Sequence, residues 1–308
     1  MNFSVIIPTY NRKWLCVRAV KSVLRQKNVL LECIVIDDCS TDETIVELKK
    51  IKDQRLKIIS TIRNSGGSSI PINYGIKYAQ YEYIAFLDSD DYWSHNRLYN
   101  ISKQSFNKLN DFQIIYSSSI ICIKYCLPRI VIAKTNGDVS KIIYTNNIIG
   151  IASRVIVKKS LLIMVGGFDE KRYMDNDWEC WMRICQYSNI YSIIQPSVFY
   201  LQNPFSISSN TKKVIIGRYK LLFEKFDKKY IKDNSASIKI QIAKLLITRG
   251  NSSVAREIIK SIKLKNIEIT IIYLLTFINN WLLQNLFSIL SYFIFTRFYF
   301  MSRLKIKS

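Results

Sequence analysis

Short apolar runs alternate with amphipathic stretches along the first 90 residues of the chain. Four runs stand out because each is apolar at its centre and ends in polar residues or in a turn: 4–7, 33–36, 57–60 and 83–87. Such a run is typical of a strand that is buried on both faces of a parallel sheet. Between the runs, apolar residues recur at helical spacing, as in the helix expected from Lys13 onward.

Strands and helices that alternate in this order predict an α/β fold with a mostly parallel sheet flanked by helices. The strands then end at one edge of the sheet, where open α/β sheets bind their ligands. Thr9 and Tyr10 follow the first strand and Asp38 follows the second. Ser40 and Glu43 have the spacing of a capping box, which predicts that a helix begins just after the second strand.

Three carboxylates follow the fourth strand, at Asp88, Asp90 and Asp91. In an extended chain, Asp88 and Asp90 point to the same side. Two like charges held together require a cation or hydrogen-bond donors beside them. Carboxylate oxygens together with a substrate's phosphates suit Mg²⁺ or Mn²⁺, so this turn is a candidate metal site. The alternative is a solvated acidic turn that caps the helix expected near Ser94.

The overall charge narrows the range of partners. The chain of 308 residues has 45 Lys and Arg against 23 Asp and Glu, a formal net charge of +22. Such an excess favours a nucleic acid, an anionic membrane surface or a phosphorylated substrate. The seven cysteines include no Cys-x-x-Cys pair and there is one histidine, a composition that disfavours a zinc site and favours reduced thiols in the cytoplasm. We expect no signal peptide, because the apolar run after Met1 is short and lacks a basic lead.

No Gly-x-Gly-x-x-Gly or Gly-x-x-x-x-Gly-Lys motif occurs in the sequence. A dinucleotide-binding oxidoreductase or a P-loop enzyme is therefore disfavoured. Any nucleotide must be held by side chains and a metal ion.

Four segments resemble, in order, the signatures of family 2 glycosyltransferases. They read VIIPTYNR at 5–12, IVIDDCSTD at 34–42, LDSDD at 87–91, and GGFDE at 166–170 followed by NDWECWMR at 176–183. The resemblance implies the GT-A fold, in which a Rossmann-like sheet binds a nucleotide sugar. It also implies a hexosyl- or N-acetylhexosaminyltransferase.

The resemblance assigns a donor site that includes a metal ion. Tyr10 would stack on the base, and Asp38 would accept a hydrogen bond from uracil. Asp88 would lie near the ribose and the metal, and Asp90 would bind the Mn²⁺ or Mg²⁺ that bridges the diphosphate. Asp91 is expected to support the loop. The other expected donor-binding residues are Pro8, Thr9, Arg12, Gly66, Asn73 and Ser89.

The same resemblance makes Asp177 the general base of an inverting displacement. It would take the proton from an acceptor hydroxyl while the metal stabilises the departing nucleoside diphosphate. Gly167, Trp178 and Glu179 are expected on the acceptor side.

Each of these assignments has a structural alternative. Tyr10 could pack at the strand end, Asp38 could cap the next helix, and Asp177 could be the N-cap of the helix that follows. One position departs from the family pattern: Ile72 stands where members often carry an arginine that assists the diphosphate. Either another cation takes over, with Arg63 as a candidate, or the phosphates are held more loosely.

The signatures define three regions: a catalytic domain over 1–205, a basic helical extension over 206–265 and hydrophobic amphipathic helices with a basic tail over 266–308. In the extension we expect helices over 212–229, 236–249 and 253–263. The stretch 269–296 has no charged residue and is long enough to cross a bilayer. Its polar residues recur every three or four positions, which favours a helix lying in the membrane interface. The alternative is a helical cap on the catalytic domain or on a homodimer partner.

The expected activity is transfer of a sugar, from a UDP-linked donor, to a hydroxyl of a glycan or lipid-linked acceptor in cell-surface polysaccharide synthesis. We expect a cytoplasmic protein, peripheral on the inner face of the cell membrane. An inactive nucleotide-sugar-binding scaffold is the first alternative, because Ile72 replaces an arginine. A basic nucleic-acid-binding protein is the second alternative. It is disfavoured and no nucleic-acid partner is expected, since lysines are scattered and carboxylates occupy the ligand edge.

Overall fold

The computed structural model of the chain describes residues 1–105, 112–123, 126–202 and 252–262, with a few isolated positions between 216 and 290. The helices expected over 212–229 and 236–249 fall outside these ranges, as does the apolar stretch 269–296. The third expected helix is present as α11, Ser252–Lys260.

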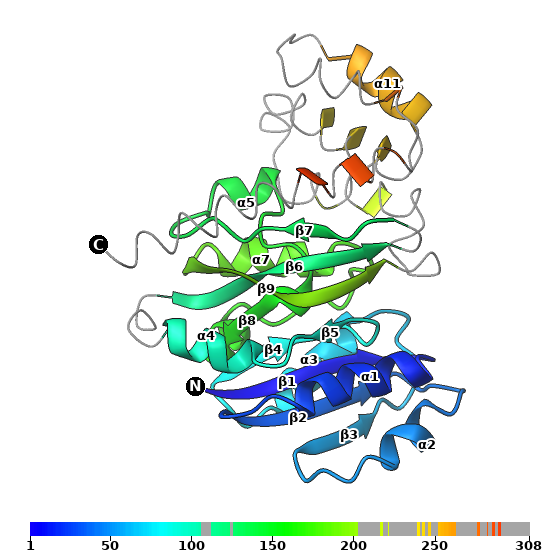
Figure 1. The fold of residues 1–308 in the computed structure, drawn as a ribbon, viewed down its shortest axis with the longest axis vertical. Helices are drawn as coiled ribbons and strands as arrows, with labels where there is room; N and C mark the ends of the chain where they lie inside the picture. The colour runs from blue at the N-terminus through cyan, green and yellow to red at the C-terminus, as the bar shows by residue number, and fades with distance from the viewer. Residues whose placement is uncertain are drawn as a thin grey trace.

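The first half of the fold is the parallel sheet that the sequence predicts. Its order is β3-β2-β1-β4, and all its pairs are parallel. The bounds of these strands are β1 Asn2–Thr9, β2 Leu30–Asp37, β3 Leu56–Ser60 and β4 Tyr83–Phe86. Their carboxyl ends meet at one edge of the sheet (Figure 1).

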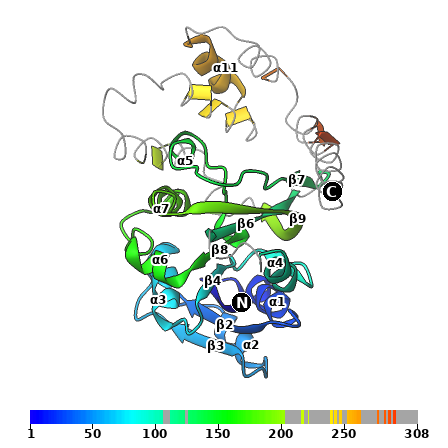
Figure 2. The ribbon, with the colours of Figure 1, turned by 90° about the vertical axis from the view of Figure 1, so that its left-hand side faces the viewer.

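Helices cover both faces of this parallel half, because alternate strand residues point to opposite faces. α1, Lys13–Leu24, packs on the face that carries Val5 and Ile7. α3, Ser69–Tyr78, packs on the opposite face, with Ile6. Figure 2 shows α1 and α3 on opposite sides of the sheet.

The second half of the nine-stranded sheet is mixed and was not anticipated from the sequence. β8 is antiparallel to β4 and to β6, whereas β6 and β9 run parallel. β5 pairs with β9 at the edge, and β7 pairs with β6. The bounds are β5 Tyr92–Trp93, β6 Phe112–Ile123, β7 Arg129–Val131, β8 Val155–Lys158 and β9 Asn189–Gln202.

The remaining helices are short. Their bounds are α2 Thr44–Lys49, α4 Arg97–Ser105, α5 Ile142–Thr145, α6 Lys159–Met164 and α7 Asn176–Ile184, with a 3₁₀ turn at Ala152–Arg154. Within the described part of the chain, none of the helices has the length and apolarity needed to cross a membrane.

The start of α2 differs from the capping-box prediction. A helix does begin just after β2, but the Ser40 hydroxyl accepts a hydrogen bond from the backbone N–H of Asn11 instead of capping α2. Asp42 takes the expected place of Ser40, because its carboxylate accepts the N–H of Thr44 at 2.9 Å. The hydroxyl of Ser40 is thereby used to join the loops that follow β1 and β2.

A buried carboxylate ties three parts of the parallel half together. Glu32 on β2 accepts hydrogen bonds from the Ser4 hydroxyl on β1 at 2.5 Å, from the backbone N–H of Gln80 at 2.7 Å and from Lys57 Nζ on β3 at 2.7 Å. Burial raises the pKa of Glu32, but the bonds from Lys57, Ser4 and Gln80 outweigh this effect and hold the pKa below its ordinary value.

We expect Glu32→Gln to lower the free energy of unfolding by on the order of 2 kcal/mol at neutral pH, because it removes a charge-assisted bond from a buried site. A lowered pKa contributes stability that is complete above the ordinary value of 4.5 and is lost as pH falls through the folded-state pKa. Urea unfolding of both proteins should therefore show the difference shrinking as pH falls below this value. A difference that stays constant down to acid denaturation contradicts the assignment.

Candidate active site

The loop after β4 is held by a serine from a distant part of the chain. The hydroxyl of Ser153 donates to Asp91 Oδ2 at 2.6 Å and accepts the backbone N–H of Asp88 at 2.9 Å. Asp91 also accepts the N–H of Leu201 at 3.2 Å and is fully buried. Asp91 therefore supports the loop, as expected, and leaves Asp88 and Asp90 to face the site.

Substitution Ser153→Ala removes both bonds and leaves a buried Asp91 oxygen with one donor fewer. We expect the free energy of unfolding to fall by about 1–3 kcal/mol. The affinity for nucleotide should fall as well, because the turn that carries Asp88 and Asp90 loses its anchor. Chemical denaturation and calorimetric titration measure the two effects. Wild-type stability in the variant contradicts the anchoring role.

Three carboxylates from two elements converge beyond the end of β4. Burial, together with the nearby charges of Asp90 and Asp177, raises the pKa of Asp88 to about 7. Because such charge effects act over short distances, Asp177 lies close to Asp88 although the two are far apart in sequence. The structure thus brings together the predicted base and the predicted metal-binding loop.

Two arginines stand beside Asp90. Burial raises the pKa of this carboxyl, and the charges of Arg12 and Arg18 partly lower it again. Arg18 Nη2 also donates to the backbone carbonyl of Asp90 at 2.7 Å. Arg63, the cation suggested by the sequence, is exposed after β3, so the cations next to this carboxylate are Arg12 and Arg18.

These donors fit a divalent cation. The described residues hold no group of three His, Cys, Asp or Glu side chains arranged around a metal position. Mg²⁺ and Mn²⁺ do not require such a group in nucleotide sites, where one or two carboxylates act together with the substrate's phosphates. Asp90 and Asp88 supply the two carboxylates, and their mutual repulsion is what a cation would relieve.

The loops after β1 and β2 are joined next to this cluster. The N–H of Asp38 donates to the carbonyl of Thr9 at 2.8 Å. Pro8 and Thr9 are buried, whereas the Tyr10 side chain is 45% exposed. Tyr10 therefore does not pack as a strand-end core residue, and its ring is accessible to a ligand.

The carboxylate of Asp38 is fixed between β2 and the turn before α3. It accepts the hydroxyl of Thr61 at 2.9 Å and both the N–H and the hydroxyl of Ser65, at 2.9 and 2.8 Å. These bonds orient Asp38 toward the turn and not toward the N-terminus of α2. The turn continues through Gly66, whose φ of +77° suits glycine.

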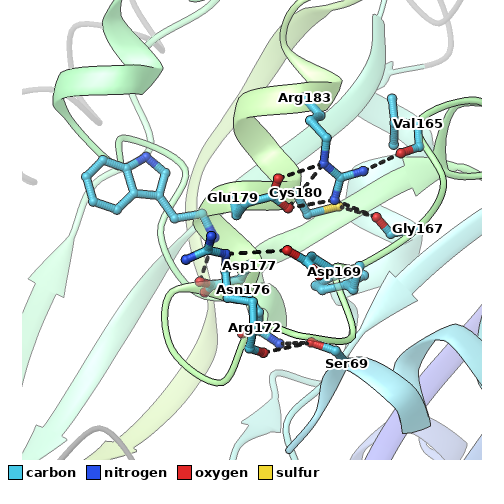
Figure 3. A network of polar contacts seen from close by, with 12 residues as sticks. Ser69, Val165, Gly167, Asp169, Arg172, Asn176, Asp177, Glu179, Cys180 and Arg183 are labelled. Atoms are coloured by element: carbon cyan, nitrogen blue, oxygen red, sulfur yellow. Dashed lines mark hydrogen bonds and ion pairs between the residues drawn. The ribbon is translucent and has the colours of Figure 1, made fainter. Parts of the chain in front are cut away.

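Asp177 lies in the first turn of α7, where the N–H of Trp178 donates to its Oδ1 at 2.6 Å. Asp175 holds the N-cap position, so the N-cap alternative for Asp177 is not realised. Figure 3 shows Asp177 beside Asp169 and Arg172, and Arg172 Nε lies 3.8 Å from Asp169 Oδ2. An anionic base at this end of α7 benefits from the positive end of the helix dipole.

The residues expected on the acceptor side turn inward. Trp178 and Glu179 are each 1% exposed. The indole of Trp178 donates to the carbonyl of Ile143 at 2.6 Å, and Glu179 is paired with Arg183 at 2.7 Å. In this structure both side chains therefore support α7 and do not face an acceptor.

Gly167 and Asn73 also act on the scaffold around Asp177. A Cβ on Gly167, at φ +69°, would lie 2.6 Å from Asn73 Oδ1. Asn73 holds the same loop through Phe168, whose carbonyl accepts at 2.8 Å and whose N–H donates at 2.8 Å. The Gly167 carbonyl accepts from Arg183 at 2.7 Å (Figure 3). Asn73 therefore attaches α3 to the loop that leads to α7.

Ile72 and Ser89 are both largely buried. Ile72 is 2% exposed and packs in the core beneath α3. Its position therefore contributes no cation to the site. Ser89, which lies between Asp88 and Asp90 in the sequence, is also buried.

Sequence reasoning missed Ser153 and Arg18. Neither lies in one of the four signatures, and serine and arginine are common on surfaces. For Arg18 the available signal was helical spacing from Arg12, which places the two residues within two turns of each other. No signal in the sequence linked Ser153 to Asp91.

Comparison with known proteins agrees with this geometry. Residues 4–107 match the model of the family described as Glycosyl transferase family 2. TarS of Staphylococcus aureus, a poly(ribitol-phosphate) β-N-acetylglucosaminyltransferase, is 33% identical over 158 residues, which cover 47% of this chain and 26% of TarS. WfgD of Escherichia coli, a UDP-Glc:α-D-GlcNAc-diphosphoundecaprenol β-1,3-glucosyltransferase, is 34% identical over 131 residues, covering 41% and 51% of the two chains. The matches thus span about a quarter to a half of these relatives.

The fold agrees over a longer range. The crystal structure of residues 1–349 of S. aureus TarS in complex with UDP-GlcNAc superimposes with a TM-score of 0.59 at 18% identity and covers 90% of each chain. This likeness concerns the fold, including the mixed second half of the sheet. Residues 4–107 of the chain therefore carry a glycosyl transferase family 2 domain.

Proposed function

We propose that this chain is a metal-dependent inverting glycosyltransferase that moves a sugar from a UDP-linked donor to a hydroxyl of a glycan or lipid-linked acceptor. The observation that carries the proposal is the convergence of Asp88, Asp90 and Asp177 at the sheet edge that also holds Tyr10 and Asp38. Such a transfer needs a general base, a metal site and a side chain that stacks on the uracil, and these residues are candidates for all three.

The names of the relatives support the donor and acceptor classes. WfgD is named as a transferase that takes glucose from UDP-Glc to a diphosphoundecaprenol-linked sugar. TarS has been crystallised with UDP-GlcNAc, and it is named as a poly(ribitol-phosphate) β-N-acetylglucosaminyltransferase. We infer a UDP-linked hexose or N-acetylhexosamine as donor and a cell-surface polysaccharide or its lipid-linked precursor as acceptor.

The chain's own residues account for donor binding. Tyr10 offers an exposed ring for the uracil, and Asp38, oriented by Thr61 and Ser65, can accept the uracil N–H. Arg12, whose charge acts on Asp90, would pair with the diphosphate. A divalent cation held by Asp90 with Asp88 would neutralise the charge that develops on the departing diphosphate.

Asp177 then acts on the acceptor. It takes the proton of the attacking hydroxyl as the new bond forms to the anomeric carbon and the bond from that carbon to the diphosphate oxygen breaks. Attack from the face opposite the leaving group inverts the anomeric centre.

An inactive nucleotide-sugar-binding scaffold is the second candidate, because Ile72 supplies no cation. Two arginines beside Asp90 favour the enzyme over the scaffold. A transfer assay separates them. The full chain is incubated with radiolabelled UDP-Glc or UDP-GlcNAc, Mn²⁺ and a bacterial lipid and glycan extract, and both label in the acceptor fraction and free UDP are measured. We expect the label in the acceptor fraction and the amount of free UDP to increase together. Tight donor binding with no transfer to any acceptor supports the scaffold.

A further inference from the structure

A hollow beside the catalytic edge is unused by the proposed reaction. It lies between α1 and the β5 segment and has a volume of about 430 Å³. We call it the basic groove, and define it by the side chains that line it and carry the argument: Trp14, Arg18, Lys21, Arg25, Tyr92 and His95.

Helical spacing creates one wall of the basic groove. Trp14, Arg18, Lys21 and Arg25 follow one another at intervals of three or four residues, so they share one face of α1. The opposite face is buried against the sheet through Cys16, Val20 and Val23. The groove wall thus belongs to the rigid core and is not a loose arm.

The exposed parts of the basic groove combine an aromatic ring with cations. The Trp14 side chain is 66% exposed, and Lys21 and Arg25 are exposed. Across the groove, the Arg18 guanidinium lies over the ring of Tyr92 at 4.8 Å. No Asp or Glu is among the residues that line the hollow in the described part of the chain. Glu43, near the start of α1, is paired with Lys13.

One N–H group in the basic groove makes no hydrogen bond among the described residues. Arg18 Nε is shielded from solvent and has no hydrogen-bond partner among the described residues. Its neighbour Nη2 is bonded to the Asp90 carbonyl, so the guanidinium cannot turn outward without breaking that bond. A buried donor of this kind is costly unless an acceptor reaches it.

We propose that the basic groove binds the headgroup of an anionic phospholipid and docks this face of the chain on an anionic membrane surface. A tryptophan at the rim of a cationic hollow matches the interfacial region of a bilayer, where aromatic rings sit at headgroup level and each nearby Lys or Arg adds attraction. A compact, half-open hollow of about 430 Å³ favours a lipid headgroup over a nucleic acid, which needs an extended basic track.

Docking there has a consequence for the reaction. α1 begins at the carboxyl ends of the strands, so a membrane against Trp14 lies next to the donor edge (Figure 1). Arg18 connects the groove directly to the loop of Asp90. An acceptor carried by a lipid would then meet the site at the surface. This consequence depends on the proposed function, whereas lipid binding itself does not.

Vesicle flotation with the full chain tests the proposal. Vesicles of phosphatidylcholine alone are compared with vesicles that also contain phosphatidylglycerol, for the wild type, for Lys21→Gln with Arg25→Gln, and for Trp14→Ala. Lys77→Gln with Lys141→Gln is the charge-matched control, because both lysines are exposed and lie on α3 and at the start of α5, away from α1. None of these residues belongs to the proposed donor site.

We expect the wild type to bind the anionic vesicles more tightly than the neutral ones, and binding to weaken with salt. The Lys21 and Arg25 double substitution should reduce anionic-vesicle affinity roughly 20- to 30-fold, since each charge near the surface accounts for about a fivefold change. Trp14→Ala should reduce binding to both vesicle types. The control should bind like the wild type. Any contribution to binding from residues outside the described ranges is common to all the variants and does not affect this comparison.

Three outcomes overturn the proposal. The wild type binds neutral and anionic vesicles equally, the α1 double variant binds like the lysine control, or the α1 variant loses affinity for single-stranded DNA but not for vesicles. UDP binding of the α1 variant is measured beside the vesicle assay. Retained UDP binding with lost vesicle binding supports the groove, and loss of both shows that the variant damages the fold. Trp14→Ala then provides the deciding measurement.

Discussion

Replacing Asp177 by asparagine should lower the turnover of sugar transfer by about 10²–10⁴-fold, the range that general acid–base catalysis contributes. Asparagine keeps the size of the side chain and an oxygen that can accept the N–H of Trp178, so the start of α7 should persist. It cannot take the proton of an acceptor hydroxyl. Donor affinity should change little, because the proposed donor contacts come from Tyr10, Asp38 and the β4 loop.

Asp175→Asn is the matched control for that experiment. Asp175 lies two residues away, holds the N-cap position of α7 and makes no side-chain cap bond. Its φ of +52° is in the left-handed region, which asparagine tolerates well. Initial rates of transfer and calorimetric affinity for UDP are measured for both variants. Similar rates in Asp175→Asn and Asp177→Asn, or wild-type turnover in Asp177→Asn, contradict the assignment of Asp177 as the base.

Asp90→Asn should separate the metal role from the structural role of the same loop. Loss of a second-shell partner of a metal typically costs about 10–100-fold in affinity or activity, so loss of a proposed ligand should cost at least that much. The expected result is a loss of Mn²⁺-dependent binding of the UDP-sugar. The free protein should be as stable as the wild type or more so, because one charge leaves the cluster with Asp88.

Asp91→Asn provides the contrast. Asp91 is fully buried and accepts from Ser153 and Leu201, so its substitution should lower the stability of the free protein. Urea unfolding of both variants, followed by UDP titration with Mn²⁺ or with a chelator, measures the two roles. Equal loss of stability in Asp90→Asn and Asp91→Asn means that Asp90 is also structural. Intact Mn²⁺-dependent binding in Asp90→Asn contradicts its role as a ligand.

The parallel half of the fold could be predicted because its strands are buried on both faces. Their sequences are then short apolar runs, and the polar residue after each run marks the strand end, as for Asp38 after β2. Because parallel strands end at the same edge of a sheet, those ends predict the edge that carries the site. Tyr10 and Asp88 lie at that edge as expected.

The mixed half could not be predicted, because its strands bury polar residues. β6 carries Ser117 in its interior, fully buried. The side chain of Arg97, also buried, donates to the hydroxyl of Ser117. The carbonyl of Ser117 accepts Arg154 Nε at 2.6 Å. A periodicity argument cannot foresee that distant arginines will satisfy a polar strand.

The same limit applies to residues predicted by resemblance. Trp178 and Glu179 lie within a signature, yet their side chains pack against Ile143 and Arg183. A motif fixes which residue types occur together, but it does not distinguish those that face the ligand from those that hold the segment in place. Asp177 differs from its neighbours because its charge reaches Asp88 across the site.

The most direct test of the central claim is a thermal-shift panel of nucleotide sugars on the full chain, with Mn²⁺ or with a chelator. A ligand at 100 times its dissociation constant stabilises the folded state by about 2.7 kcal/mol, enough for a clear rise in melting temperature. We predict that a UDP-sugar raises the melting temperature when Mn²⁺ is present and fails to do so with the chelator. The absence of a shift with every nucleotide sugar, or an equal shift with and without the metal, would contradict a metal-dependent donor site at Asp88 and Asp90.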